Sequence, residues 1–360
     1  MKREIYLETT PLNEAIEKWI KRLEAEGALK PLSGEKVQVK DSLGRITSEP
    51  VIAKISSPFY HSSAMDGYAV RYVDTFGASE TSPKKLKLKT QAVYVDTGDP
   101  IPDGFNAVIM IEDVNVISSQ RSAVSDQQEN KKMQDTPSLT LPPRGGGKGG
   151  GGNSEIEEFI EIIEPATPWQ NVRVIGEDIV ATELILPENH KIRPVDIGAM
   201  LAGGHVEINV RKRPKVVIIP TGTEIVEPGS DLKKGDIIEF NSRMLGGIVS
   251  EWGGDAVRFR IVPDNFEGLK KAILEAHELG DMIVVNAGAS AGSEDFTANA
   301  IREIGEVILH GVNIKPGKPV ILGLVKGKPV LGIPGYPVSA YITFNLFAKP
   351  VVYKWQGREA

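Results

Sequence analysis

The stretch "DMIVVNAGASAGSEDF", Asp281 to Phe296, contains a strand-like run, a loop of small residues and the start of a helix. The run "DMIVV" has the length and apolar content of a buried strand, and "TANAIREIG", which follows Phe296, has helical spacing. Small loop residues allow a ligand to approach the backbone, whereas the adjacent carboxylates of Glu294 and Asp295 suit a cation or a proton transfer. The stretch therefore predicts a strand-to-helix unit with a site at its turn.

The same alternation continues on both sides of this stretch. Strand-like runs "KVVIIP", "AVRFRIV" and "PVLGIP" alternate with helical stretches "NSRMLGGIVSEWG", "FEGLKKAILEAHELG" and "PVSAYITFNLF". Such an alternation predicts a mainly parallel sheet covered by helices on both faces. Residues 211–347 are therefore expected to form a three-layer α/β domain, in which ligands bind beyond the carboxyl ends of the strands.

The segments before residue 211 follow other patterns. The run "PLNEAIEKWIKRL", Pro11 to Leu23, has the spacing of an amphipathic helix. Residues 51–117 consist mainly of short runs such as "GYAV", "AVYV" and "AVIMI", divided by Gly, Pro and Asp, which predicts a β-rich domain. Residues 118–154 are polar and end in a glycine run. Because such a segment cannot bury enough apolar area to offset its ordering entropy, we predict that it is disordered.

Composition excludes several classes of function. The 360-residue chain has no cysteine, which excludes disulfides, thiolate zinc sites and a cysteine nucleophile. Its five histidines show no metal-ligand spacing, so any metal is expected to be a hard one held by oxygen. The net charge of −6 gives no footprint for nucleic acid. No apolar run reaches the roughly 18 residues of a membrane span, and the N-terminus lacks the apolar core of a secretory signal. These features predict a cytoplasmic protein that binds neither nucleic acid nor membrane.

Small and polar residues follow each predicted strand of the α/β domain. Because the carboxyl ends of parallel strands meet at one edge, we expect these loops to lie together. Their N–H groups, hydroxyls and helix N-termini would bind an anion, and the carboxylates of Glu224, Asp264 and Asp295 would bind a cation. A phosphate ester with Mg²⁺ uses both. The predicted binding residues of these loops are Thr221, Gly222, Gly288, Ser290, Gly292, Ser293, Pro334, Gly335, Pro337 and Ser339.

Several common motifs are absent from the sequence. There is no GxxxxGK[ST] phosphate loop and no GxGxxG turn opening a βαβ unit, so neither that class of NTPase nor dinucleotide-dependent hydride transfer is expected. The stretch "GASAG" (288–292) fits the letters GxSxG, but small residues surround its serine and no histidine is nearby in the sequence, so it is not interpreted as a nucleophile elbow.

Seven motifs occur in order along the chain. They are "SAMDGYAV" (63–70), "TGDPIPDGFNAVIMIED" (97–113), "NVRVIGEDI" (171–179), "PTGTEIVEPG" (220–229), "NAGASAGSEDF" (286–296), "KPGKP" (315–319) and "GIPGYPVSA" (332–340). Together they resemble the molybdopterin molybdenumtransferases, the family of MoeA and the C-terminal domain of gephyrin. The chain departs from the usual family residues in "NAGASAG", where a threonine and larger apolar residues are common, and at Tyr336, where asparagine is common.

The resemblance implies an enzyme that inserts molybdate or tungstate into adenylylated molybdopterin and releases AMP with the assistance of Mg²⁺. Such enzymes are elongated homodimers. On this resemblance Asp66 enters the active cleft from the partner subunit, Asp178 supports the site, and Glu224, Asp264 and Asp295 line it. The expected Mg²⁺ ligands are Glu224, Asp295 and Asp66.

Other implied roles concern charge and domain arrangement. Lys315, Lys318 and Arg243 would offset the charge of the anionic substrates, and Pro334 and Pro337 would shape the wall of the cleft. Residues 1–50 and 155–210 would form a discontinuous, elongated α+β domain that links and dimerises the chains. Family members continue into a small C-terminal β-barrel domain, so residues 348–360 are interpreted as a truncated tail. The predicted fold class is thus α/β multidomain.

Two alternatives belong to different functional classes. The first is adenylylation of molybdopterin, because adenylyltransferases share this α/β domain; such an adenylyltransferase could equally be a partner of the chain. The second is a non-catalytic scaffold that binds a pterin and assembles partners. Carboxylates dispersed away from the sheet edge would favour the scaffold.

Overall fold

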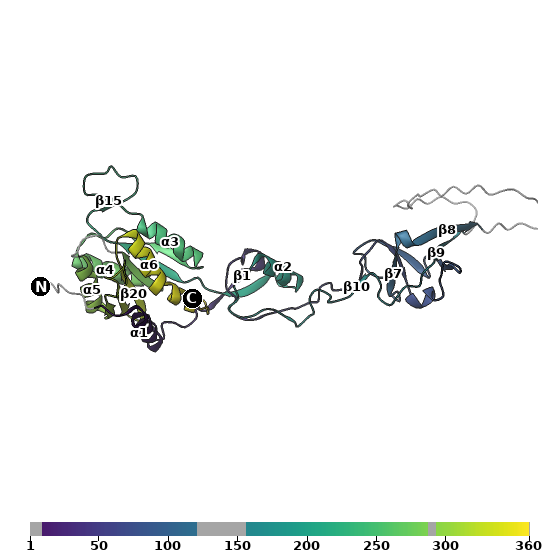
Figure 1. Ribbon diagram of the computed structural model, residues 1–360, viewed down its shortest axis with the longest axis horizontal. Coiled ribbons are helices and arrows are strands. Elements are labelled where there is room, and N and C mark those ends of the chain that lie inside the picture. Colours follow the sequence, from purple (N-terminus) through teal and green to yellow (C-terminus); the bar gives the residue numbers. More distant parts are fainter. Residues whose placement is uncertain (1–8, 121–155, 287–292, 360) are drawn as a thin grey trace, which may run out of the picture. The chain divides into compact units, whose positions relative to one another are not determined.

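The computed structural model describes residues 9–120, 156–286 and 293–359 (Figure 1). The chain divides into two compact units, of which the first comprises Met1–Ala53 with Glu183–Ala360 and the second Lys54–Thr182. No helix within the described ranges is long and apolar enough to span a membrane. Predictions that concern residues 121–154 lie outside the described residues.

A six-stranded sheet forms the centre of the first unit. Its strand order is β16-β13-β17-β20-β19-β18. The first four strands run parallel, whereas β19 pairs antiparallel with both β20 and β18. The mainly parallel sheet predicted from the sequence is therefore confirmed. The strands are β13 (Lys215–Pro220), β16 (Asp255–Arg258), β17 (Met282–Asn286), β18 (Glu306–His310), β19 (Ile321–Val325) and β20 (Lys328–Ile333).

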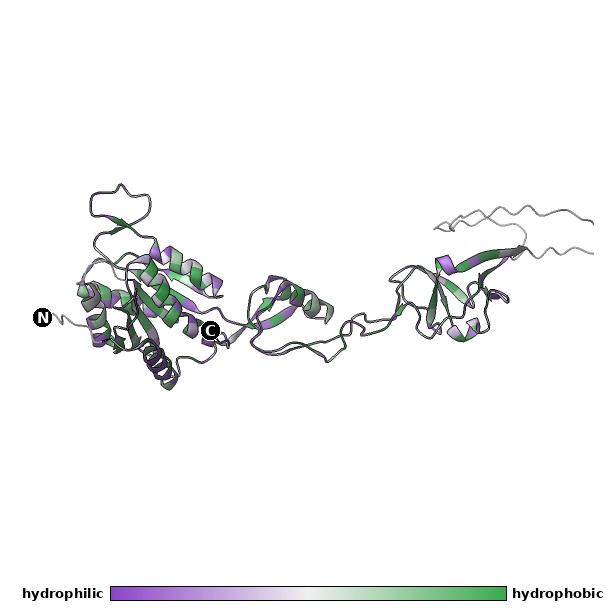
Figure 2. Ribbon diagram, in the orientation of Figure 1, coloured by the Kyte–Doolittle hydropathy of each residue, from purple (hydrophilic) through white to green (hydrophobic). Residues whose placement is uncertain are grey.

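Helices cover both faces of this sheet (Figure 1). Alternate residues of β13 point to opposite faces, so Val216 and Ile218 belong to one core cluster while Val217 and Ile219 belong to the other. All four side chains are fully buried. The strands β13, β17 and β20 are correspondingly apolar over most of their length, and the helices carry apolar stripes (Figure 2). The covering helices are α3 (Asn241–Glu251), α6 (Pro337–Phe347) and α7 (Lys349–Trp355) on the first face, and α4 (Phe266–His277) and α5 (Ser293–Ile304) on the second.

The predicted amphipathic helix is α1 (Leu12–Ala25). Its buried residues Ala15, Trp19 and Leu23 join the core cluster of α3, α6 and α7, and the indole of Trp19 donates to the carbonyl of Phe347 at 3.0 Å. Residues of α7 lie in the same cluster. Both α1 and α7 therefore pack on the α/β core, whereas the predicted domain boundaries stay a prediction.

A small α+β region occupies the rest of the first unit. Strand β1 (Gly34–Gln38) pairs antiparallel with β12 (Glu207–Arg211), and β2 (Val51–Ile52) pairs with β11 (Leu184–Leu186). A short 3₁₀ helix, η1 (Val39–Asp41), and helix α2 (Pro194–Ala202) pack on them around a separate apolar cluster. A two-stranded ribbon, β14 (Ile225–Val226) with β15 (Ile237–Ile238), projects from the α/β region (Figure 1).

The second unit is rich in short strands, as predicted. Three small sheets have the orders β6-β4-β7, β5-β9-β8 and β10-β3. Strand β8 continues to Gln120, three residues into the range predicted to be disordered. The elements are β3 (Ser62–Ser63), β4 (Gly67–Val70), η2 (Tyr72–Thr75), β5 (Lys84–Lys87), β6 (Ala92–Val95), β7 (Ala107–Met110), η3 (Ile111–Asp113), β8 (Val114–Gln120), β9 (Ile156–Ile162) and β10 (Val172–Arg173).

Candidate active site

The carboxyl ends of the parallel strands are tied together by hydrogen bonds. Thr221, just after β13, bridges Val262 in the segment after β16, and its N–H donates to the carbonyl of Asn286 at the end of β17 at 2.9 Å. The side chain of Asn286 donates through Nδ2 to the carbonyl of Pro334 after β20 at 3.0 Å. The predicted meeting of these loops at one sheet edge is therefore found.

A cavity opens at this edge. Three predicted binding residues, Thr221, Gly335 and Pro337, line it, and Pro334 holds its wall through the bond to Asn286. Asn241, the first residue of α3, donates through Nδ2 to the carbonyl of Gly335 at 2.6 Å. The complete lining is Pro220, Thr221, Ile225, Ile237, Ile238, Glu239, Phe240, Asn241, Asn286, Gly335, Tyr336 and Pro337.

Two predicted catalytic carboxylates lie close to each other. Glu224 follows β13 and Asp264 follows β16. Burial, together with the nearby negative charge of Glu224, raises the pKa of Asp264 above its ordinary value, although the Thr223 contact opposes this. Neither carboxylate forms an ion pair with a described Lys, Arg or His side chain. Two acids that repel each other without a compensating cation are typical of functional sites.

Glycine is required beside this pair. Gly222 has a φ of +146°, and a Cβ built there would lie 2.6 Å from Cγ1 of Ile225 and 3.1 Å from Oε2 of Glu224. A side chain at position 222 would therefore push on the carboxylate of Glu224. Gly222 thus leaves room for the Glu224 carboxylate, and its assignment as a binding residue stays a prediction.

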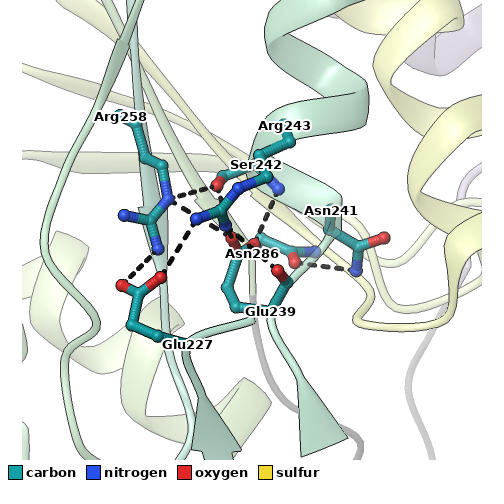
Figure 3. A network of polar contacts seen from close by, with 7 residues as sticks. All are labelled: Glu227, Glu239, Asn241, Ser242, Arg243, Arg258 and Asn286. Carbon is teal, nitrogen blue, oxygen red and sulfur yellow. Dashed lines mark hydrogen bonds and ion pairs between the residues drawn. The ribbon is translucent and has the colours of Figure 1, made fainter. Parts of the chain in front are cut away.

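A second group of acids near the cavity is fully compensated (Figure 3). Glu239, whose side chain is 2% exposed, accepts bonds from the N–H and hydroxyl of Ser242 at 2.7 Å each and from Arg243 Nη1 at 2.7 Å. Arg258 Nε lies 3.3 Å from the same carboxylate and donates through Nη2 to Glu227 at 2.6 Å. Arg243 was expected to offset substrate charge; here its guanidinium is occupied by Glu227 and Glu239.

The two predicted lysines lie at the same edge of the sheet. Since β18 is antiparallel to β19, which is antiparallel to β20, the segment between β18 and β19 returns to the edge where β20 ends. Lys315 and Lys318 are in this segment, both are exposed, and neither forms an ion pair with a described carboxylate. Ser339 is buried in the first turn of α6 and is not part of the cavity lining.

Part of the predicted site is not described. Gly288, Ser290 and Gly292 lie outside the described residues. Ser293 and Asp295 lie in the first turn of α5, which follows β17, so their backbone is at the expected edge. Their assignment as binding and catalytic residues stays a prediction.

Asp66 and Asp178 belong to the second unit. Asp66 Oδ1 accepts bonds from the N–H and the hydroxyl of Thr97 at 2.7 and 2.8 Å, and these bonds lower the pKa of Asp66, which keeps it ionised. Asp178 pairs with Arg173 Nη2 at 2.6 Å.

The residue after Asp66 must be glycine. A Cβ at Gly67 would lie 2.0 Å from the carbonyl oxygen of Ile109, so glycine must follow Asp66 for β4 to pair with β7.

The described residues give a partial fit to a Mg²⁺ site. Within them, no group of three or more His, Asp or Glu side chains could hold a metal ion. Glu224 and Asp264 alone offer two hard oxygen ligands with no competing cation. Two carboxylates suffice for Mg²⁺, which usually keeps several water ligands. The chemistry of this pair is compatible with Mg²⁺, and the ligand roles predicted for Glu224, Asp295 and Asp66 all stay predictions.

Comparison with known proteins identifies the domains that carry this site. Residues 10–204 match the MoeA N-terminal region (domain I and II), and residues 217–354 match the probable molybdopterin binding domain. The chain belongs to the MoeA family. This MoeA-family chain is 34% identical over 328 residues to a putative molybdopterin biosynthesis protein of Methanocaldococcus jannaschii. The alignment covers 87% of this chain and 72% of that protein. It is 29% identical over 339 residues to the molybdopterin molybdenumtransferase of Haemophilus influenzae, covering 91% and 74%.

Solved structures agree with this assignment. The crystal structure of a molybdopterin biosynthesis MoeA protein from Pyrococcus horikoshii matches the MoeA-family chain with a TM-score of 0.76 and 33% identity, covering 98% of this chain and 81% of that one. The predicted family, fold class and enzyme class are thus confirmed, and the chain is an enzyme of molybdenum cofactor biosynthesis. Sequence reasoning missed Asn241, whose only signal was its place at the start of the helix after "DIIEF".

Proposed function

We propose that this chain inserts molybdate or tungstate into adenylylated molybdopterin and releases AMP. The observation that supports this most directly is the sheet edge, where the cavity and the carboxylates of Glu224 and Asp264 lie within the segment matched by the molybdopterin binding domain. The proposal includes Mg²⁺ as cofactor, a cytoplasmic location and a homodimer.

Each part of the edge has a role in this proposal. The cavity wall formed by residues at the ends of β13 and β20 positions the substrate, and Lys315 and Lys318 offset its negative charge. Mg²⁺, held by Glu224 and Asp264, would supply charge stabilisation for cleavage of the phosphoanhydride. The raised pKa of Asp264 reflects its burial and the negative charge of Glu224, and a bound cation would relieve that repulsion.

The test is release of AMP by the purified chain. The reaction contains adenylylated molybdopterin, Mg²⁺ and molybdate, and AMP is quantified against time by chromatography. Stoichiometric substrate binding without AMP would contradict the transferase and leave a scaffold. A parallel reaction with ATP and non-adenylylated molybdopterin tests the adenylyltransferase alternative, which predicts formation of the adenylylated pterin.

A second experiment tests whether Asp66 acts across the proposed homodimer. Asp66→Asn and Asp264→Asn should each abolish AMP release without unfolding the protein. In dimers made by co-expressing both variants, a site shared between subunits would combine intact Asp264 from one chain with intact Asp66 from the other. Random assembly then restores about a quarter of the wild-type activity, because about half of the dimers are mixed and one of their two sites is intact. No restoration would mean that Asp66 and Asp264 act within one chain, or that Asp66 has a structural role.

A further inference from the structure

One residue that lines the cavity carries a buried hydrogen-bond acceptor with no partner among the described residues. Asn241 is 7% exposed and lines the cavity. Its Nδ2 donates to Asn286 Oδ1 at 2.9 Å and to the carbonyl of Gly335 at 2.6 Å, whereas its Oδ1 is buried and accepts no bond from any described residue. In Figure 3 the nitrogen of Asn241 points toward Asn286 and the oxygen is turned away from it. Buried polar atoms in native proteins are nearly always paired, so an acceptor of this kind calls for an explanation.

The orientation of the Asn241 amide is fixed by its neighbours. A backbone carbonyl can only accept, so Pro334 requires the nitrogen of Asn286 on its side and leaves Asn286 Oδ1 facing Asn241. The carbonyl of Gly335 is a second acceptor facing Asn241. Turning the Asn241 amide over would bring its oxygen against both acceptors. The free atom is therefore an acceptor, and whatever pairs with it must be a donor.

The residues that line the cavity indicate what kind of ligand could carry that donor. Apart from Thr221, Glu239 and the two asparagines, the lining side chains are apolar or aromatic, and Phe240 and Tyr336 contribute rings. The two arginines nearest to Glu239 are engaged by carboxylates. The described lining of this cavity includes no Lys, Arg or His, so a phosphate inside it would leave water for a largely apolar wall, which is unfavourable. A flat heterocycle instead would bury its faces against the walls and present an N–H at its edge.

We infer that Asn241 Oδ1 accepts a hydrogen bond from a ring or amino N–H of a flat heterocyclic substrate, and that Asn241 thereby determines which heterocycles the cavity binds. The inference rests on the proposed function, which supplies two such rings: the pterin and the adenine of the adenylyl group. Both carry N–H donors.

The experiment compares ligands that differ only in their donors. Lumazine has the pterin ring skeleton and N–H groups, and 1,3-dimethyllumazine has none; AMP and N6,N6-dimethyl-AMP form the corresponding adenine pair. Binding of each to the full chain is measured by calorimetry. An unsatisfied buried acceptor predicts that methylation weakens one pair by about 10- to 100-fold. The pair that responds identifies the ring. Equal affinities within both pairs, or no binding of any probe at millimolar concentration, would overturn the inference.

A variant separates a lost hydrogen bond from a clash with the added methyl groups. In Asn241→Leu, which has a similar volume, the preference for the N–H ligand should fall to less than about 3-fold. Ser250→Ala, an exposed change on the same helix, should keep it. A preference retained in Asn241→Leu would assign the effect to the methyl groups and overturn the inference. If Asn241→Leu does not fold, the wild-type pairs decide alone.

The two proposals can fail separately. Selective binding by wild-type protein that never releases AMP would contradict the transfer reaction and keep the role of Asn241. Release of AMP together with unselective binding would support the transfer reaction and contradict the role of Asn241.

Discussion

The α/β region has two pairs of acidic residues near one sheet edge, and the two pairs differ in whether arginines neutralise their charge. Glu227 and Glu239 share two arginines, and Glu239 also accepts two bonds from Ser242. Glu224 and Asp264 have each other as charged neighbours and no described cationic partner. The charges of the first pair are thus compensated. Those of the second pair are not, which is expected of a site that binds a cation or a proton.

The difference also separates residues that look alike in the sequence. Glu224 and Glu227 are three positions apart in "TGTEIVE". Only the pairing of the arginines in space shows that Glu227 belongs to a structural network while Glu224 is free to bind.

The largest effect is expected from breaking the compensated pair. Glu239→Ala would leave Arg243 and Arg258 without their buried partner and remove the acceptor for Ser242. We expect a loss of about 2–4 kcal/mol in the free energy of unfolding, measured by urea denaturation. Glu227→Gln is the control, because Glu227 binds the same arginines at an exposed position, and this substitution should cost clearly less than Glu239→Ala. Equal losses in the two variants would contradict the central role of Glu239.

Mg²⁺ should act on the uncompensated pair alone. At a Mg²⁺ concentration 100-fold above its dissociation constant, the wild-type protein should gain about 2.7 kcal/mol of stability. The gain is read as an increase in the urea midpoint, and Ca²⁺ is compared at the same ionic strength. Glu224→Gln and Asp264→Asn should each lose most of the gain, whereas Glu227→Gln should keep it. A gain that survives both substitutions would place the cation elsewhere.

A smaller effect is expected at Gly222. Gly222→Ala adds a methyl group at a φ of +146° and close to the Glu224 carboxylate. The variant should lose about 1–2 kcal/mol of stability and bind Mg²⁺ more weakly, because Glu224 has to move. Gly229→Ala is a suitable comparison, since Gly229 also has a positive φ of +88° but no atom within 4 Å of its Cβ position. Its Mg²⁺ affinity should be unchanged; a matching loss in both variants would mean that backbone strain alone is responsible.

The α/β architecture could be predicted because local patterns determine it. The apolar runs of β13, β17 and β20 are buried on both faces, and the helices between them keep helical spacing. The same patterns predict that Thr221, Glu224, Asp264 and the residues after β20 lie at one edge, because the carboxyl ends of parallel strands all lie at the same edge of the sheet.

The polar network could not be predicted in this way. Arg258 lies in β16 and Arg243 in α3, and their pairing with Glu227 and Glu239 depends on contacts between elements that no local pattern records. For the same reason the sequence alone indicates neither that Arg243 pairs with Glu227 and Glu239 nor that Asn241 lines the cavity. The position of α1 on the α/β core is a further example. The apolar face of α1 predicts that the helix packs on another element, but it does not identify that element.

The smallest effect, and the one that compares the two acid pairs most directly, is the pH dependence of stability. The pKa of Asp264 is raised by burial and by Glu224, so the folded protein binds a proton at Asp264 more readily than the unfolded chain does. The contribution of Asp264 therefore becomes more favourable as the pH falls from neutral through its folded pKa toward the unfolded value of about 3.9. The pKa of Glu227 is lowered by Arg258 and Arg243, so its contribution is present above its unfolded pKa and is lost as the pH falls. The difference in unfolding free energy between wild type and Asp264→Asn should thus rise on acidification, by less than about 1 kcal/mol, while that between wild type and Glu227→Gln should fall. Urea titrations from pH 7 to pH 3.5 measure both, and slopes of the same sign would show that the two pairs of acids do not differ in the way their contacts indicate.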